Sequence, residues 1–120
     1  MKTLILLIGF ILSIIIVGCG TTSKDTFYWG DYSTTLYEYK KNPGEETFEA
    51  HKKELMSLME YSTENNKTVP PGLNAEYGYI LLKEGFEDEG LEYLSKEIEL
   101  YPESAPFINR IKNEYNKGVK

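Results

Sequence analysis

The chain has 120 residues and a formal net charge of −6, and its length allows one domain with one modest core. The acidic balance argues against nucleic acid as a partner and against electrostatic binding to anionic lipid, because both need a basic face. A single Cys and a single His exclude an intramolecular disulfide and any metal site built from several such ligands. We therefore expect no metal and no cofactor.

The first eighteen residues have the anatomy of an export signal. Lys2 gives a positive start, and an apolar run follows over residues 4–17, interrupted only by Gly9 and Ser13. As a helix this run would span about 21 Å, less than the ~30 Å hydrocarbon core of a membrane. A short apolar stretch that ends in small residues is typical of a signal peptide, so residues 1–18 are predicted to be removed.

The end of this segment reads Ile16-Val17-Gly18-Cys19, which resembles the bacterial lipobox. The resemblance implies cleavage between Gly18 and Cys19, a diacylglycerol on the Cys19 thiol and a fatty acyl group, such as palmitate, on the new amine. Gly20 stands where an Asp would imply the inner membrane, so the implied location is the outer membrane, facing the periplasm. Two alternatives stay open: a buried apolar thiol at the end of a signal anchor, and a free thiol after ordinary cleavage.

Lipid on Cys19 would by itself hold the protein on a membrane. Each buried chain methylene contributes about 0.8 kcal/mol, and two or three acyl chains bind stably where one binds marginally. Residues 19–26 are then the lipidated Cys and a short polar tether rich in Thr and Ser. We place the folded part of the chain at residues 27–117 and a polar tail at residues 118–120.

After the tether the chain has a helical period. Apolar residues recur at spacings of three and four, and segments that contain Pro or Gly separate the periodic stretches. Asp31 or Ser33 is expected to cap the first helix, Gly85 to end the third, and Phe107 and Ile108 to face inward on the fifth. The loops are short, so we predict an all-α fold of antiparallel helical hairpins. The five predicted helices cover residues 31–41, 45–64, 73–84, 87–101 and 104–115.

One segment has the signature of a helical repeat. Residues 71–104 resemble a tetratricopeptide repeat, which is about 34 residues long. Gly78 and Gly90 match the small residues of that motif, and we expect them to face each other where the two helices cross. Asn74 and Glu97 depart from the motif, which usually has a large residue and an Ala at these places. The remaining matches are Leu81, Gly85, Leu94 and Pro102.

A second and poorer register of the same repeat starts near residue 26. In this register the motif positions of the first helix call for a large, a large, a small and a large side chain in turn. They are occupied by Trp29, Tyr32, Ser33 and Leu36. The last helix then resembles the amphipathic cap that closes such arrays. The alternative that stays open is a generic helical bundle in which the glycines are accidental.

A resemblance to one family covers nearly all of the chain after the tether. It is carried by Tyr28-Trp29-Gly30-Asp31-Tyr32-Ser33, Leu36-Tyr37 and Asn42-Pro43-Gly44. Over residues 27–115 the chain resembles the small bacterial lipoproteins of the domain of unknown function 4810 family. This resemblance implies an envelope partner, namely a lipoprotein similar to the curli secretion channel subunit. No catalytic or binding residue is established for the family, so the resemblance implies a location and a partner class, not a reaction.

The sequence holds no catalytic constellation, so we expect a protein that is not an enzyme. His51 is the single imidazole, and a catalytic His needs a nucleophile or an acid beside it, whereas Cys19 is assigned to lipid. We expect His51 to be a half-exposed helix residue. An acidic run lacks the alternating ligands and central glycine of a calcium loop, and we attribute it to helix ends and solvation. This run consists of Glu84, Glu87, Asp88, Glu89 and Glu92.

Tyrosines are the remaining unusual feature. Those off the predicted apolar stripes, and therefore expected to be exposed, are Tyr37, Tyr61, Tyr79 and Tyr93. Exposed tyrosines suit a groove for a partner peptide or helix, and the alternative is that they fill gaps in the core. We expect a lipid-anchored adaptor that binds another envelope protein. The alternative is a lipoprotein carrier that binds a small ligand, peptide or glycan in an aromatic groove.

Overall fold

The computed structural model describes residues 26–118. The predicted signal peptide, Cys19 and most of the tether lie outside the described residues. Within residues 26–118 the chain forms five α-helices, one short 3-10 helix and no strand, which confirms the predicted all-α class. No helix in this range combines the length and the apolar character that crossing a bilayer requires. The elements are α2 (Tyr32–Lys41), α3 (Glu45–Glu64), α4 (Leu73–Glu84), α5 (Glu87–Leu100), η2 (Pro102–Ser104) and α6 (Ala105–Gly118).

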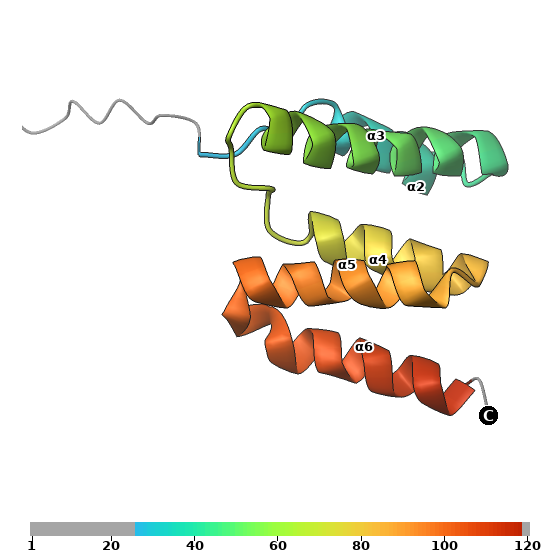
Figure 1. Ribbon diagram of the computed structural model, residues 1–120. Helices are drawn as coiled ribbons and strands as arrows, with labels where there is room; N and C mark the ends of the chain where they lie inside the picture. The colour runs from blue at the N-terminus through green and yellow to red at the C-terminus, as the bar shows by residue number, and fades with distance from the viewer. Residues whose placement is uncertain (1–25, 119–120) are drawn as a thin grey trace, which may run out of the picture.

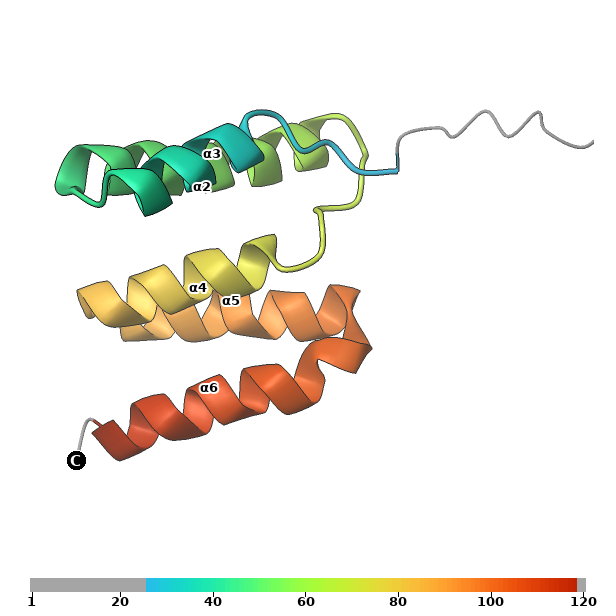
Figure 2. The same cartoon turned by 180° about the vertical axis from the view of Figure 1, so that it is seen from behind.

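The helices stack in three tiers (Figure 1). α2 and α3 form one antiparallel hairpin, α4 and α5 form a second, and α6 covers the side of the second hairpin that faces away from the first. The view from behind shows the same order of tiers (Figure 2). The linker between α3 and α4 lies at the end of the stack where the described chain begins, and the C-terminal end of α6 lies at the opposite end.

α4 is the central helix because apolar side chains pack on it from both neighbouring tiers. Toward the first hairpin, a buried cluster consists of Leu55, Leu58, Met59, Leu73, Tyr77, Ile80 and Leu81. Toward α5 and α6, a second buried cluster consists of Ala75, Leu82, Leu94 and Ile108. α4 is therefore apolar on two faces, as expected of a helix that is buried rather than amphipathic.

α4 and α5 approach each other so closely that two positions leave no room for a side chain. A Cβ atom on Gly78 would lie 2.8 Å from the carbonyl oxygen of Gly90, and one on Gly90 would lie 2.9 Å from the carbonyl oxygen of Gly78. Both distances are shorter than Cβ atoms adopt in folded proteins. The two glycines face each other, as the repeat pattern predicts.

The turn between α4 and α5 is a Schellman motif. Gly85 has a φ of 90°, a left-handed conformation that glycine adopts without a Cβ penalty. Its N–H donates to the carbonyl of Leu82 at 3.2 Å, and the N–H of Phe86 donates to the carbonyl of Leu81 at 2.9 Å. These two bonds satisfy carbonyl groups at the end of α4 and turn the chain back into α5.

In both hairpins the second helix supplies a carboxylate to the start of the first. Glu54 of α3 accepts a hydrogen bond of 2.8 Å from the N–H of Asp31, just before α2. Glu97 of α5 accepts bonds from the N–H groups of Gly72 at 2.7 Å and of Ala75 at 3.3 Å, at the start of α4. Negative charge at these positions also suits the positive end of a helix dipole.

Three expectations from the sequence are wrong in detail. α2 begins at Tyr32, so Trp29 precedes the helix instead of filling it, and its ring lies 5.5 Å from the Tyr32 ring. Asp31 occupies the N-cap position of α2, but its side chain makes no capping hydrogen bond, and Ser33 lies inside the helix. Phe107 is 62% exposed because its neighbour Ile108 faces the core, and consecutive helix residues point about 100° apart.

Candidate interaction surface

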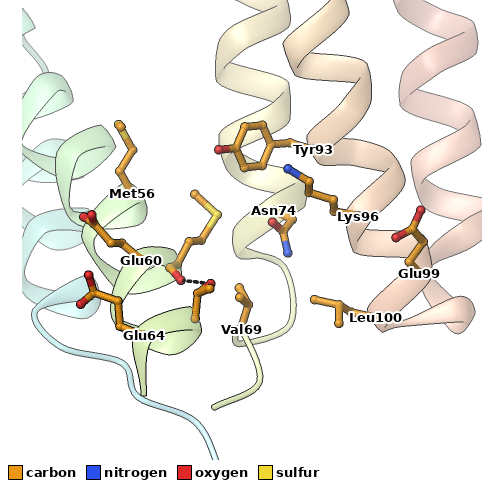
Figure 3. A pocket seen from close by; sticks show the side chains of 11 residues that line it. Met56, Glu60, Glu64, Val69, Asn74, Tyr93, Lys96, Glu99 and Leu100 are labelled. Carbon is orange, nitrogen blue, oxygen red and sulfur yellow. Dashed lines mark hydrogen bonds between the residues drawn. The ribbon is translucent and has the colours of Figure 1, made fainter. Parts of the chain in front are cut away.

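A groove runs between α3 and α5, across the start of α4 (Figure 3). Its volume is about 560 Å³, and it is open to solvent along its length. α3 forms one wall and α5 forms the other. The residues that line it are Met56, Met59, Glu60, Thr63, Glu64, Val69, Asn74, Tyr93, Lys96, Glu99 and Leu100. We call it the α3–α5 groove.

The α3–α5 groove combines an apolar floor with an acidic rim. Two of its apolar side chains are unusually accessible, since Met56 is 49% exposed and Leu100 is 44% exposed. The carboxylates that line the groove belong to Glu60, Glu64 and Glu99. None of them forms an ion pair or a hydrogen bond with another described residue. The groove therefore offers uncovered apolar surface together with unneutralised negative charge.

The one cation on the groove, Lys96, is already engaged. Its Nζ lies 2.7 Å from a carboxylate oxygen of Glu92 and 4.5 Å from the centroid of the Tyr93 ring. The hydrogen bond to Glu92 is the main cause that raises the pKa of Lys96 above its ordinary value. Lys96 also interacts with the charge of Glu99 on its own helix. The groove carboxylates that have no cation partner among the described residues are therefore those of Glu60 and Glu64.

Asn74 lies at the base of the α3–α5 groove. The residue is only 3% exposed, and its carboxamide has no hydrogen-bond partner within residues 26–118. Figure 3 shows the carboxamide pointing into the space between Val69 and the α5 wall. Among the described residues no fully buried side-chain nitrogen or oxygen lacks a partner, so the carboxamide of Asn74 still reaches solvent at the base of the groove. It is therefore accessible to a polar group of a bound partner.

The linker that borders the groove is fixed from α5. The hydroxyl of Tyr101 donates a hydrogen bond of 2.6 Å to the carbonyl of Val69. Burial is the main cause that raises the pKa of Tyr101, so the hydroxyl keeps its proton and this bond near neutral pH. Pro102 then begins η2 and turns the chain toward α6.

The four tyrosines expected to form a partner surface do not gather on one face. Tyr37 is 60% exposed and Tyr79 is 46% exposed, as expected. Tyr61 and Tyr93 are half-buried, so their predicted exposure is wrong. The Tyr61 ring packs at 4.0 Å on that of Tyr28, and the Tyr93 ring packs edge-on at 4.8 Å against that of Tyr77. Of the four, only Tyr93 lines the α3–α5 groove.

A second hollow, of about 360 Å³, lies between α4 and α6. It contains two tyrosine rings, Tyr79 from α4 and Tyr115 from α6, with Leu82 and Ile111 beside them. Its volume falls at the lower end of the range for small-molecule sites. This hollow and the α3–α5 groove have no lining residue in common.

His51 lies in a buried polar network that joins the first three helices. It is 1% exposed, so the expectation of a half-exposed histidine is wrong. Its Nδ1 lies 2.8 Å from the Thr35 hydroxyl of α2, and its Nε2 lies 3.1 Å from a carboxylate oxygen of Glu76 of α4. The hydroxyl of Tyr32 donates to the other oxygen of Glu76 at 2.9 Å. Burial, together with this bond, raises the pKa of Tyr32 to about 12.

This network ties α2, α3 and α4 together. A hydroxyl, an imidazole and a carboxylate in series resemble a nucleophile, a base and an acid. However, none of the three best-formed grooves of residues 26–118 is lined by Thr35, His51 or Glu76. The arrangement therefore accounts for how α2 is held on α3 and α4.

A comparison with known protein families matches residues 26–111 to the domain of unknown function DUF4810. The chain belongs to this family. The match covers α2 to α5 and the first half of α6, so all residues of the α3–α5 groove lie within the DUF4810 domain. Neither a search of curated proteins nor a search of solved structures found a match.

Some notable residues of this DUF4810 domain were marked in the sequence only as departures from the repeat pattern. Asn74 and Glu97 are both nearly fully buried, one unpaired in the groove and the other bonded to the start of α4. A polar residue at an expected core position was the signal that pointed to them. Glu60, Glu64 and Glu99 carried no such signal, because the sequence does not show which exposed acids share a groove. Cys19, with Gly18 before it, lies outside the described residues.

Proposed function

We propose that this DUF4810 protein is a non-catalytic, lipid-anchored adaptor that binds another protein of the bacterial envelope. The observation that carries the proposal is the α3–α5 groove, which is about 560 Å³ in volume and leaves Met56 and Leu100 largely uncovered. Uncovered apolar side chains inside a polar rim are typical of a surface that docks a protein segment.

The anchor would determine where this docking occurs. The proposed lipid on Cys19 is supported by the Ile16-Val17-Gly18-Cys19 sequence and by the apolar run before it. Acyl chains would confine the domain to a membrane surface, which we propose to be the outer membrane facing the periplasm. A tethered domain meets a partner on the same membrane at a raised effective concentration, so a weak groove contact becomes sufficient. A lipoprotein similar to the curli secretion channel subunit is the partner class that we propose.

We also propose that the stack is a short tetratricopeptide-repeat-like array, with α6 as its cap. Support comes from the close approach at Gly78 and Gly90. Further support is that both hairpins place a Glu of the second helix, Glu54 or Glu97, at the start of the first. In such arrays neighbouring repeats share one continuous core and present an extended binding surface.

The anchor is tested with Cys19→Ser, with Ser23→Ala as the matched control in the tether. We expect Cys19→Ser to keep its fold but leave the membrane fraction after a carbonate wash, whereas Ser23→Ala stays bound. A Cys19→Ser chain that remains in the washed membrane would contradict the lipid anchor.

For the adaptor role, the anchored chain at native expression should retain an envelope protein at a fixed ratio. Repeated failure to retain one would count against that role.

The alternative is a carrier for a small ligand, and the hollow between α4 and α6 is the observation that favours it. Two tyrosines, Tyr79 and Tyr115, line this hollow, and aromatic rings suit a flat or sugar-like ligand. Native mass spectrometry of the full chain purified from its own envelope separates the two functions. A small bound molecule that is lost in Tyr79→Ser, but kept in the exposed control Tyr37→Ser, would favour the carrier.

A further inference from the structure

We propose that the occupant of the α3–α5 groove is a short, extended, basic segment of the partner protein, which inserts an apolar side chain and bonds to Asn74. This inference deepens the adaptor function proposed above and rests on it. Three features of the groove determine the chemistry of the occupant, namely its charge, its apolar floor and its unpaired carboxamide.

The charge of the groove favours a cationic segment. Glu60 and Glu64 lie one turn apart on the α3 wall, and Glu99 lies on the α5 wall (Figure 3). None of the three forms an ion pair within residues 26–118; Lys96 is held by Glu92 and interacts with the charge of Glu99 at longer range. Figure 3 draws the carboxylates of Glu60 and Glu64 on the outer side of α3, so they form the rim of the groove and not its interior. Long Lys or Arg side chains that flank the inserted residue would reach over this rim to them. Complementary charge of this kind raises the association rate and selects against acidic partners.

The floor of the groove favours an apolar side chain between those cations. Met56 on the α3 wall and Leu100 on the α5 wall are exposed and lie at opposite ends of the groove, and Tyr93 and Val69 also line it and are half-buried (Figure 3). The thioether side chain of Met is flexible and adapts to side chains of different shape. A Leu-sized side chain inserted here would cover part of this apolar surface.

The carboxamide of Asn74 favours an extended main chain over a helix. It offers one acceptor oxygen and two donor hydrogens, and it has no partner in the described part of the chain. One residue of an extended strand presents its own N–H and C=O on the same side of the chain, and these two groups can pair with a carboxamide in two parallel bonds. The peptide units inside a helix are already bonded to one another and cannot do so.

The test uses the full chain in detergent and a fluorescent probe peptide, Lys-Lys-Ser-Leu-Ser-Lys-Lys. Binding is measured by fluorescence anisotropy at fixed salt. We expect the probe to bind at least about tenfold more tightly than a version with Glu in place of Lys, and than a version with Gly in place of Leu. Equal binding of the three peptides would overturn the inference.

Variants of the chain then locate the binding site. We expect Glu60→Lys/Glu64→Lys to weaken probe binding by about tenfold and Asn74→Leu to weaken it by about fivefold. The matched control is Glu87→Lys/Glu89→Lys, which makes the same change in net charge at the other end of α5. This control should change the affinity for the probe peptide by no more than about twofold relative to the unmodified chain. Groove variants that bind as well as this control would overturn the inference.

Two further outcomes separate the groove inference from the adaptor function. If the anchored chain retains an envelope protein that Glu60→Lys/Glu64→Lys still binds fully, the groove inference fails and the adaptor function stands. If no envelope protein is retained by any form of the chain, the adaptor function fails, whatever the probe peptide shows. A full chain that dimerises in solution, and becomes monomeric in Glu60→Lys/Glu64→Lys, would show that a second copy occupies the groove and would overturn the inference.

Discussion

The two hairpins of the domain are held together by different kinds of contact. Eight residues of α4 are buried, and the hairpin of α4 and α5 closes through the contact between Gly78 and Gly90. No residue of α2 is fully buried. α2 is held by half-buried rings, since Tyr32 packs against the core and Tyr39 packs on a ring of α3, and by the hydrogen bonds of Tyr32 and Thr35. The apolar core of the domain therefore lies on both faces of α4, against α3 on one side and against α5 and α6 on the other. α2 is a peripheral helix that half-buried rings and hydrogen bonds keep in place.

This difference indicates where the domain is stable and where it opens. Contacts that exclude water and fill space contribute most to the free energy of unfolding, whereas a typical hydrogen bond contributes about 1 kcal/mol net. Changes in the second hairpin should therefore cost more than comparable changes around α2. α2 should also open locally before the rest of the stack unfolds.

The largest expected effect is at the closest helix contact. Gly78→Leu should lower the free energy of unfolding by about 3 kcal/mol, because the new side chain meets backbone atoms of α5 that cannot move aside. The control is Gly118→Leu, since a Cβ atom added at Gly118 would have no other atom within 4 Å, and it should change stability by less than about 0.5 kcal/mol. Urea unfolding measures both. Similar values for the two variants would mean that the helices do not cross closely at Gly78.

The next largest effect concerns Glu97 and Glu54, the two carboxylates that bond to main-chain N–H groups at the start of a helix. They should differ in how much each contributes to the free energy of unfolding. Glu97 is 2% exposed and bonds to two N–H groups at the start of α4, so Glu97→Ala should cost about 2 kcal/mol. Glu54 makes its bond to Asp31 in an exposed position, and Glu54→Ala should cost about 0.5 kcal/mol. Thermal unfolding of the two variants gives the comparison. A cost for Glu54→Ala equal to that for Glu97→Ala would show that α2 is as firmly held as α4.

Removing a hydrogen bond that holds α2 should lower the free energy of unfolding by less than removing the Glu97 carboxylate does. Tyr32→Phe keeps the ring but removes the hydroxyl that donates to Glu76, and should cost about 1 kcal/mol. Tyr39→Phe is the matched control on the same helix, since the Tyr39 hydroxyl makes no hydrogen bond within residues 26–118 and its ring packs on Phe48. Denaturant titration should separate the two variants. A cost for Tyr39→Phe as large as that for Tyr32→Phe would argue against the Glu76 bond.

The same hydroxyl gives a pH dependence of defined sign. The pKa of Tyr32 is about 12 in the fold against about 10 in the unfolded chain, so the fold favours the protonated form. Its contribution is complete below about pH 10 and is lost as the pH rises toward 12. The stability difference between the unmodified chain and Tyr32→Phe should therefore shrink between pH 9 and pH 11.5. A difference that stays constant over this range would contradict the raised pKa.

The sequence predicted the helices well because local signals specify them. Pro and Gly mark the breaks near Gly44, Gly72 and Gly85, and the paired glycines Gly78 and Gly90 mark the close crossing. Repeating apolar positions identified one buried face of each helix, but not the second face of α4, where Ala75 and Leu82 are buried against α5 and α6. At Phe107 two adjacent apolar residues made the inward one ambiguous.

The groove and the polar network could not be predicted from local pattern. His51 is buried because Thr35 and Glu76, sixteen and twenty-five positions away, meet it from two other helices. Asn74 lies at the base of the α3–α5 groove because α3, α4 and α5 converge there. Such groupings depend on how the tiers stack, and the spacing of residues along one helix carries no information about them.

The most direct test of the adaptor account is photo-cross-linking in intact cells from a single groove position. A photo-reactive residue in place of Met56 should give one discrete adduct with an envelope protein, and this adduct should disappear in Glu60→Lys/Glu64→Lys. The same residue in place of Asn109, which is exposed on α6 outside the α3–α5 groove, should give none. No adduct from position 56, or the same adduct from both positions, would contradict the account.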